Sequence, residues 1–501
     1  MAFPRSAGIL VHPTSLPGPG GIGTLGADVF DFLETLRAGG ITCWQVLPLS
    51  PTGYGDSPYS ALSAFAGNPF LIALEPLVDA GWLMSEDLAP INALPESRVD
   101  FGRLIPAKMD TLWRAFRRFR ASQTNLDSLH EFSAAEAVWL DDYALYMAIK
   151  DARGGAPWID WESELRGRDE LALEAARREL FESIEFHHFV QFIFFQQWGA
   201  VKWHAGELGI KIIGDIPIFV AFDSADVWAH QDLFQLDHQG QPEVIAGVPP
   251  DYFSATGQLW GNPHYRWDVM ADKGYAWWIE RFRMALRQVD IVRLDHFRGF
   301  AGAWAVPYGN STAEHGAWVP GPASALFAAL HATLGTLPII AEDLGVITPD
   351  VKALRAEFEF PGMQILQFAF GSDPENGALP HNFERNTAVY TGTHDNDTTI
   401  GWWMSVDEEE RQAVRDYTGT TGFDVAWDMI RLAFASVADL AIVPMQDVLR
   451  LGTISRMNLP GKADGNWSWR FVHGALTEAH LAGLKTFVQT YGRESVASHD
   501  R

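Results

Sequence analysis

Short runs of aliphatic and β-branched residues recur along the chain and alternate with segments whose apolar positions are three or four residues apart. The first pattern is typical of buried strands, and the second of amphipathic helices. Between the first two runs, Val29, Phe32 and Leu36 follow the helical spacing, which gives a strand–helix–strand unit. Eight strands are predicted in all, at 7–12, 41–49, 210–220, 291–298, 337–344, 363–370, 388–395 and 440–448.

Eight strands separated mostly by helical segments predict an α/β fold, a closed (β/α)8 TIM barrel. An open doubly wound sheet is disfavoured, because no strand is followed by a G-x-G-x-x-G or Walker loop. We expect a single catalytic domain over 1–501 with two insertions at the C-terminal face of the strands. One is a mainly helical insertion at 60–200, and the other is a loop insertion at 225–268 over the active site.

The composition narrows the possible partners. The chain has 501 residues with 37 basic and 63 acidic side chains, a net charge of −26, which argues against nucleic acid and anionic membrane surfaces. No apolar run is long enough to span a bilayer, and the first ten residues lack the pattern of a secretory signal. The sole cysteine, Cys43, cannot form an intrachain disulfide, which fits a reducing cytoplasm.

Three of the predicted strands end in carboxylates, namely Asp295, Glu342 and Asp395. Strand ends converge on one site in a barrel, so these groups are expected to meet. Arg293 lies two residues before Asp295 and therefore on the same face, where it holds that carboxylate ionised as a nucleophile needs. Glu342 follows an apolar run, and burial beside other carboxylates raises the pKa of such a group, as a general acid needs. This division of labour is that of retaining glycoside chemistry.

Plainer interpretations of the same residues stay open. Arg293 and Asp295 could form a purely structural pair, and the three carboxylates could be unrelated. The stretch 395–397, Asp-Asn-Asp, resembles an oxygen-rich cation loop but lacks the glycine and distal glutamate of an EF-hand. No histidine has the H-E-x-x-H spacing of a zinc site, and His187-His188 is expected to be structural. We therefore predict no metal and no cofactor.

The chain resembles the amylomaltases, the 4-α-glucanotransferases (disproportionating enzymes) of glycoside hydrolase family 77 in the α-amylase superfamily. The resemblance runs almost from end to end of the chain. It is carried by motifs at 7–9, 54–68, 214–217, 247–263, 292–299, 341–345, 390–398, 456–458 and 466–470. The family has no separate C-terminal β-domain, so none is expected here.

The resemblance implies specific roles for residues of this chain. It implies Asp295 as nucleophile, Glu342 as acid/base and Asp395 as transition-state stabiliser. The residues implied to surround the sugar in subsite −1 are Tyr59, Asp215, Arg293, His296 and His394. The aromatic contacts implied for glucan and acceptor are Tyr54, Phe253 and Trp260.

The implied reaction transfers a segment of an α-1,4-glucan to the 4-hydroxyl of another sugar, with maltooligosaccharides as substrates. Three rivals remain: an α-amylase-like hydrolase, a metal-dependent barrel lyase or isomerase, and a non-catalytic glucan-binding protein. Paired strand-end lysines, which a metal-dependent lyase would show, are absent, and a binding protein would have lost a carboxylate. The oligomeric state stays open, with a monomer as the preferred expectation.

Overall fold

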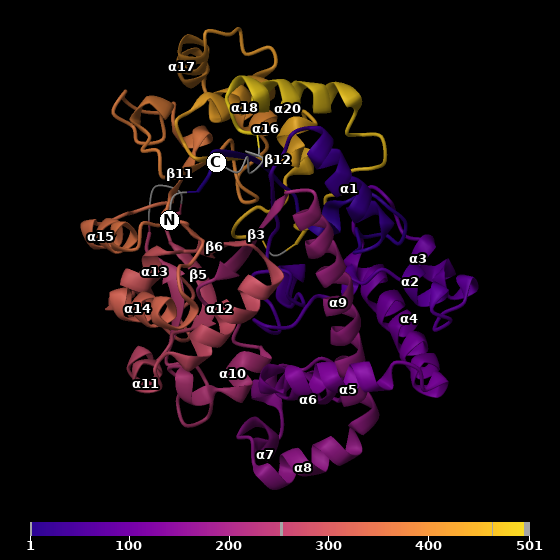
Figure 1. Cartoon of the computed structure of the whole chain (residues 1–501). Coiled ribbons are helices and arrows are strands. Elements are labelled where there is room, and N and C mark those ends of the chain that lie inside the picture. Colours follow the sequence, from indigo (N-terminus) through magenta and orange to yellow (C-terminus); the bar gives the residue numbers. More distant parts are fainter. Residues whose placement is uncertain (1–2, 251–253, 463, 495–501) are drawn as a thin grey trace.

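A closed barrel of eight parallel strands forms the centre of the protein (Figure 1). The computed structural model describes residues 3–250, 254–462 and 464–494. Around the barrel the strand order is β1-β12-β11-β10-β9-β6-β3-β2. The strands are β1 (Ser6–Leu10), β2 (Cys43–Gln45), β3 (Lys211–Pro217), β6 (Ile291–Asp295), β9 (Ile339–Ala341), β10 (Gly362–Ile365), β11 (Thr387–Tyr390) and β12 (Leu440–Pro444). All eight predicted strands are confirmed, each shorter than its apolar run.

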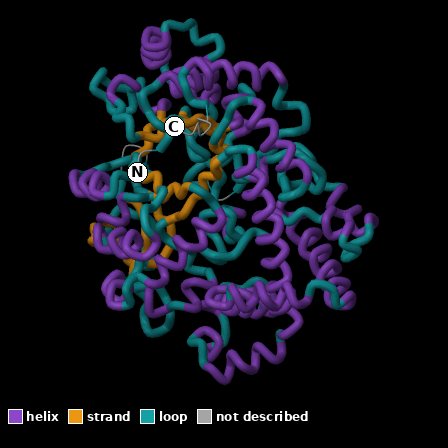
Figure 2. The backbone as a smooth tube through the Cα atoms, viewed as in Figure 1, coloured by secondary structure: helices purple, strands orange, loops and turns teal. Residues whose placement is uncertain are grey.

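Helices surround the strands, which lie together in the interior (Figure 2). Burial on both faces explains why most residues of the barrel strands are apolar, with Arg293 on β6 and Asp215 on β3 among the charged exceptions. Helices that follow or precede barrel strands are α1 (Ala27–Ala38), α12 (Ala276–Gln288), α14 (Ala323–Leu334), α15 (Pro349–Glu357), α18 (Val425–Ala435) and α20 (Glu478–Thr490). Shorter or peripheral helices are α10 (Ala225–Ala229), α11 (Trp267–Asp272), α13 (Arg298–Ala301), α16 (Thr399–Ser405), α17 (Glu408–Thr418) and α19 (Met445–Val448).

A group of helices occupies the chain between β2 and β3. They are α2 (Glu75–Asp79), α3 (Ala89–Asn92), α4 (Phe101–Ser122), α5 (Leu126–Ala135), α6 (Ala137–Ala152), α7 (Ser163–Arg166), α8 (Glu170–Glu179) and α9 (Phe181–Glu207). The tract at 171–198 belongs to two helices, α8 and α9. The Phe-rich part of α9 packs against α4, where Phe186 stacks on Trp113 with ring centroids 4.0 Å apart. These aromatics are therefore core, as such a face usually is. His187 contacts Asp151 in this layer at 2.9 Å.

A second, four-stranded antiparallel sheet lies outside the barrel, in the order β5-β4-β7-β8. Its strands are β4 (Val244–Val248), β5 (Gln258–Pro263), β7 (Gly302–Pro307) and β8 (Ala317–Pro320). The expectation of an irregular loop throughout 225–268 is wrong, because β4 and β5 pair with each other and β4 pairs with β7. Glycine allows the two strands to approach closely here, because a Cβ on Gly247 would lie 2.4 Å from the carbonyl oxygen of Gln258.

The register of the barrel brings the charged residues of neighbouring strands together. Asp215 on β3 pairs with Arg293 on β6, and Pro217 pairs with Asp295. On the other side of β6, Leu294 pairs with Ala341, the residue before Glu342. Neighbouring residues in a parallel register share a face, so the ends of β3, β6 and β9 present their polar side chains to one region.

Candidate active site

Arg293 lies between two carboxylates at the mouth of the barrel. Its Nη1 is 2.6 Å from Oδ2 of Asp215, and its Nη2 is 2.9 Å from Oδ1 of Asp295. The side chains of Arg293 and Asp215 are 4% and 0% exposed, whereas that of Asp295 is 27% exposed. The guanidinium favours the charged form of Asp215. Asp295 is thus the carboxylate of this cluster that an incoming substrate can reach.

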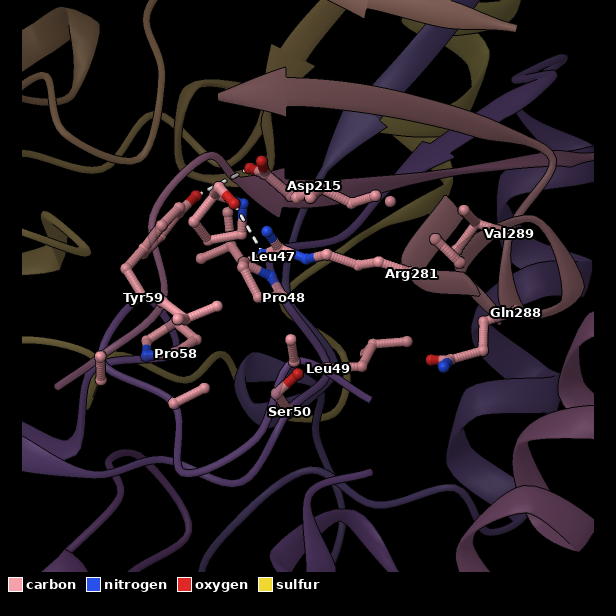
Figure 3. A pocket seen from close by; sticks show the side chains of 18 of the residues that line it. Leu47, Pro48, Leu49, Ser50, Pro58, Tyr59, Asp215, Arg281, Gln288 and Val289 are labelled. Atoms are coloured by element: carbon pink, nitrogen blue, oxygen red, sulfur yellow. Dashed lines mark hydrogen bonds between the residues drawn. The ribbon is translucent and has the colours of Figure 1, made fainter. Parts of the chain in front are cut away.

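Tyr59 closes the cluster from the loop that follows β2. Its hydroxyl donates to Oδ2 of Asp215 at 2.8 Å, and its ring stacks on His394 with centroids 5.0 Å apart and planes 11° apart. A cavity of about 70 Å³ lies beside β3 and is lined by Leu47, Tyr59 and Asp215 among others (Figure 3). Burial raises the pKa of Asp215 to about 7, and Arg293 opposes that rise. The pair of Tyr59 and Asp215 therefore forms a buried polar wall of the site.

Glu342 follows β9 and is held by two backbone amides. His296 N donates to Oε2 at 2.7 Å, and Leu344 N donates to Oε1 at 2.9 Å. Burial raises the pKa of Glu342 to about 7, the charge of Asp295 adds to the rise, and Arg293 and the two amides limit it. With a pKa of about 7, a substantial fraction of this carboxyl is protonated near neutral pH, which is the property that a general acid needs.

His296 combines a left-handed backbone with a neutral ring. Its φ is +51°, unusual for a residue other than glycine, and such conformations cluster at functional sites. This backbone turn aims the amide of His296 at Glu342. Burial lowers the pKa of the imidazole to about 4, and its Nε2 has no hydrogen-bond partner within the described part of the chain. The edge of Trp260 meets the ring, with centroids 4.8 Å apart.

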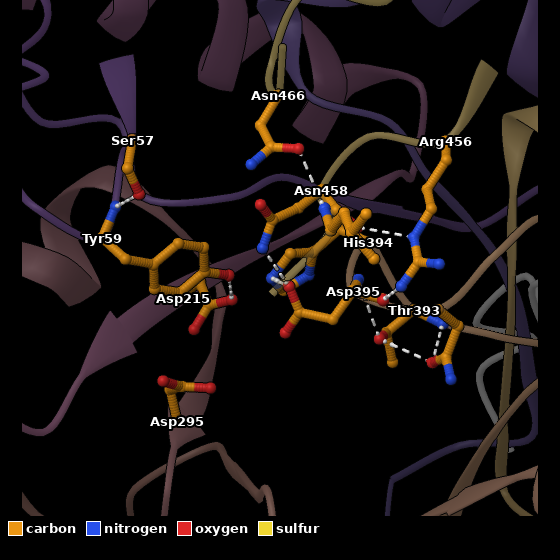
Figure 4. Close-up of polar contacts among 12 residues, drawn as sticks. Ser57, Tyr59, Asp215, Asp295, Thr393, His394, Asp395, Arg456, Asn458 and Asn466 are labelled. Atoms are coloured by element: carbon orange, nitrogen blue, oxygen red, sulfur yellow. Dashed lines mark hydrogen bonds and ion pairs between the residues drawn. The ribbon is translucent and has the colours of Figure 1, made fainter. Parts of the chain in front are cut away.

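Asp395 lies on the loop after β11 and is 46% exposed. Asn458 Nδ2 donates to its Oδ1 at 2.6 Å, His394 Nε2 lies 3.3 Å from the same oxygen, and Arg456 donates to its backbone carbonyl (Figure 4). The side chains of Asp215, Asp295 and Asp395 lie around one region in this view. Asn458 and Arg456 are not among the site residues that the sequence predicts, although the motif at 456–458 is part of the resemblance. Nothing in the sequence around 456–458 indicates that this motif lies beside Asp395, because Asn458 and Asp395 are 63 positions apart.

The neighbours of Asp395 are engaged in loop hydrogen bonds. Asn396 Oδ1 accepts from the backbone N of Thr393 at 2.9 Å, and Asp397 Oδ2 accepts from Thr453 Oγ1 at 2.9 Å. Over residues 3–250, 254–462 and 464–494, no group of three or more His, Cys, Asp or Glu side chains is placed to hold a metal ion. The oxygen-rich stretch at 395–397 thus organises its own loop.

The aromatic residues expected to contact glucan are less closely grouped. Trp260 on β5 is 37% exposed and contacts His296 at the site, whereas Tyr54 on the loop after β2 is 80% exposed. Phe253 lies outside the described residues. Trp260 thus contacts a predicted site residue, His296.

These features define a class of enzyme. A (β/α)8 barrel places one ion-paired carboxylate, Asp295, and one carboxyl of raised pKa, Glu342, at the ends of adjacent parallel strands. That combination suits enzymes that cleave and re-form glycosidic bonds.

Comparison with known proteins identifies the family. A family model described as 4-alpha-glucanotransferase matches residues 11–475. The chain is 50% identical to a 4-alpha-glucanotransferase of Thermus thermophilus, over 98% of this chain and all of that protein. It is 46% identical to a chloroplastic/amyloplastic 4-alpha-glucanotransferase of Solanum tuberosum, over 98% of this chain and 86% of that protein. The chain therefore belongs to the 4-α-glucanotransferase family.

A solved structure agrees with this result. The amylomaltase from Streptococcus agalactiae in complex with acarbose superimposes with a TM-score of 0.96 at 38% identity, over 98% of this chain and all of that chain. The predicted barrel, the predicted family and the predicted kind of enzyme, one that transfers glycosyl groups, are confirmed.

Proposed function

We propose that the protein transfers a segment of an α-1,4-glucan to the 4-hydroxyl of glucose or another glucan by a retaining double displacement. The observation that carries the proposal is that two different carboxyl groups occur in one site. Asp295 forms an ion pair with Arg293, and burial raises the pKa of Glu342 to about 7. Family membership supports the transfer activity, and the acarbose complex of the related amylomaltase fits a glucan substrate.

In the first step, an oxygen of Asp295 attacks the anomeric carbon of the donor sugar and forms a covalent glycosyl ester. The Glu342 carboxyl gives its proton to the glycosidic oxygen, so the reducing-end fragment departs as a neutral alcohol. Asp395, held by Asn458, stabilises the positive charge that develops on the sugar ring.

In the second step, the Glu342 carboxylate takes a proton from the 4-hydroxyl of the acceptor. The acceptor oxygen then attacks the anomeric carbon, the ester bond to Asp295 breaks, and Glu342 is protonated again. Two inversions restore the α-configuration. Both steps draw on the side chains of Asp295 and Glu342, and the chemistry needs no metal or organic cofactor.

Product analysis tests the proposal. Chromatography of the products formed from maltotriose separates transfer, which yields glucose together with longer oligosaccharides, from hydrolysis, which yields only shorter sugars. Longer oligosaccharides are expected. Short products alone would contradict the transferase assignment and favour an α-amylase-like hydrolase.

Further points belong to this proposal. We infer that the substrates are maltooligosaccharides and starch- or glycogen-type glucans. We also infer that the protein works as a monomer in the cytoplasm. The single buried cysteine, Cys43, fits a reducing compartment. Among the described residues, no helix is long and apolar enough to cross a membrane. We also propose that the helices within 60–200 form an insertion subdomain and that 225–268 covers the active site.

A further inference from the structure

The loop that follows Glu342, residues 343–348, is fastened at both of its ends. At its start, Asp343 accepts from Arg355 Nη1 at 2.6 Å and from the backbone N of Met363 at 2.8 Å. At its end, Arg298 Nη1 donates to the carbonyl oxygen of Val346 at 2.9 Å. Between the two anchors, Leu344 N donates to Oε1 of Glu342. The position of that amide therefore depends on both anchors.

Arg298 is itself held in place by an aromatic side chain. Its guanidinium carbon lies 3.8 Å from the ring centroid of Trp318, on the edge strand β8 of the antiparallel sheet. The same Nη1 also donates to Thr348 Oγ1 at 3.1 Å, at the residue that precedes α15. A planar guanidinium stacked on an indole loses little freedom when it makes these bonds. The contacts form one connection from the second sheet to the loop beside Glu342.

We propose that Arg298, stacked on Trp318, is a positioning residue that holds the 343–348 loop so that the amide of Leu344 stays bonded to Glu342. The proposal rests on the assignment of Glu342 as the acid/base. Arg298 does not touch the reacting atoms and acts through the loop. The antiparallel sheet then serves the chemistry twice, through Trp260 on one edge strand and through Trp318 on the other.

The proposal predicts the direction in which the pKa of Glu342 changes when the loop is loosened. A hydrogen bond from Leu344 N favours the charged form of Glu342 and so lowers its pKa. Loosening the loop weakens that bond and raises the pKa. The other charges that act on Glu342, those of Asp295 and Arg293, sit on β6 and are not touched by the change. The charged group that acts on Arg298 is Asp350, on α15. The basic limb of the activity profile should therefore move to higher pH.

The experiment measures kcat/KM for maltotriose disproportionation against pH, together with thermal unfolding. Arg298→Ala should move the basic limb up by roughly half to one pH unit, about the worth of one hydrogen bond, and lower kcat roughly tenfold. Trp318→Ala should move the limb in the same direction by less. Arg298→Lys keeps the positive charge without the planar guanidinium that stacks on Trp318, and it should still show the shift.

A second arginine–tryptophan pair provides the control. Arg415 on α17 lies 5.4 Å from the ring centroid of Trp403, in a different part of the molecule from α13 (Figure 1). Arg415→Ala should leave the limb unchanged. If Arg298→Ala folds and its basic limb does not move, the proposal is overturned. If Arg298→Ala does not fold, an unmoved basic limb in both Arg298→Lys and Trp318→Ala overturns the proposal. If the basic limb is shifted in Arg298→Ala but normal in Arg298→Lys, the effect comes from the positive charge, and the proposal is overturned as well.

The failure of this inference can be told from the failure of the proposed function. Glu342→Gln measured alongside should lose activity and its basic limb. If Glu342→Gln keeps full activity, the acid/base assignment itself is wrong. If Glu342→Gln is inactive but the Arg298 variants have normal profiles, only the positioning role is wrong.

Discussion

The barrel mouth and the four-stranded antiparallel sheet differ in how they hold their side chains. At the mouth, Arg293 and Asp215 are buried and joined by an ion pair, and Glu342 is fixed by two amides. On the sheet, Trp260 and Trp318 are 37% and 43% exposed. The first region orders charged groups before any substrate arrives, as electrostatic catalysis requires. The second region holds tryptophan side chains that stay partly exposed.

This contrast divides the proposed reaction between the two regions. Bond breaking depends on charges whose positions tolerate little movement, so changes at the mouth should cost most. The choice of sugar over water as acceptor depends on weaker contacts to exposed aromatic rings, so changes on the sheet should alter ratios of products. Four predictions test the division, from the largest effect to the smallest.

Asp295→Asn removes the attacking carboxylate while it keeps the shape of the side chain. Turnover of maltotriose should fall by about 10⁴-fold or more, with the fold preserved by circular dichroism. Asp232→Asn, which breaks only an exposed pair with Lys273, is the control and should leave turnover unchanged. Substantial transfer by a folded Asp295→Asn protein would remove Asp295 from the nucleophile role.

The proton on Glu342 should set the alkaline limit of activity. This carboxyl has a pKa raised by burial to about 7, and its protonated form is the active one in the first step, so kcat/KM should decline as pH rises through about 7. Glu342→Gln should lower activity by about 10²- to 10⁴-fold and remove this limb. If the basic limb of the pH–activity profile persists unchanged in Glu342→Gln, it belongs to another group, which would contradict the assignment of Glu342 as the acid/base.

Asn458 should matter through Asp395 alone. Asn458→Ala removes the 2.6 Å hydrogen bond to Oδ1 and frees the carboxylate to rotate, so kcat should fall roughly 10- to 100-fold with little change in KM. The matched control is Asn386→Ala. Asn386 directly precedes β11, and its side chain donates a hydrogen bond to the carbonyl oxygen of Glu359, which the variant loses. Equal losses in the two variants would mean a general loss of stability.

Trp260→Ala should change the products more than the rate. Loss of the indole over His296 opens the acceptor side to water, so the ratio of chain lengthening to glucose release by hydrolysis should fall about two- to tenfold. Trp203→Ala, at an exposed tryptophan on α9, is the control. If transfer and hydrolysis fall by the same proportion, Trp260 only packs the strand, and the division between the two regions is wrong.

Much of the barrel could be predicted because its signals are local. A strand buried on both faces is mostly apolar, so each of the eight runs can be recognised without knowledge of its partners. Carboxylates that interrupt such runs at their ends are equally visible, which is why Asp295, Glu342 and Asp395 were found. The pairing of Arg293 with Asp295 also followed from the two-residue period of a strand.

Features that depend on partners distant in sequence were decided by the tertiary structure. The sequence predicts a loop where β4 and β5 lie, because the pairing of β4 with β7 depends on a segment distant in sequence. Asp215 and Arg293 are 78 positions apart, and Asn458 and Asp395 are 63 positions apart. The sequence by itself determined where the barrel strands run and which carboxylates stand at their ends, since apolar runs and strand period are properties of short segments. Only the closed barrel decided which of them touch, because hydrogen bonds and ion pairs require two groups to meet, and the register of separate strands determines where they do.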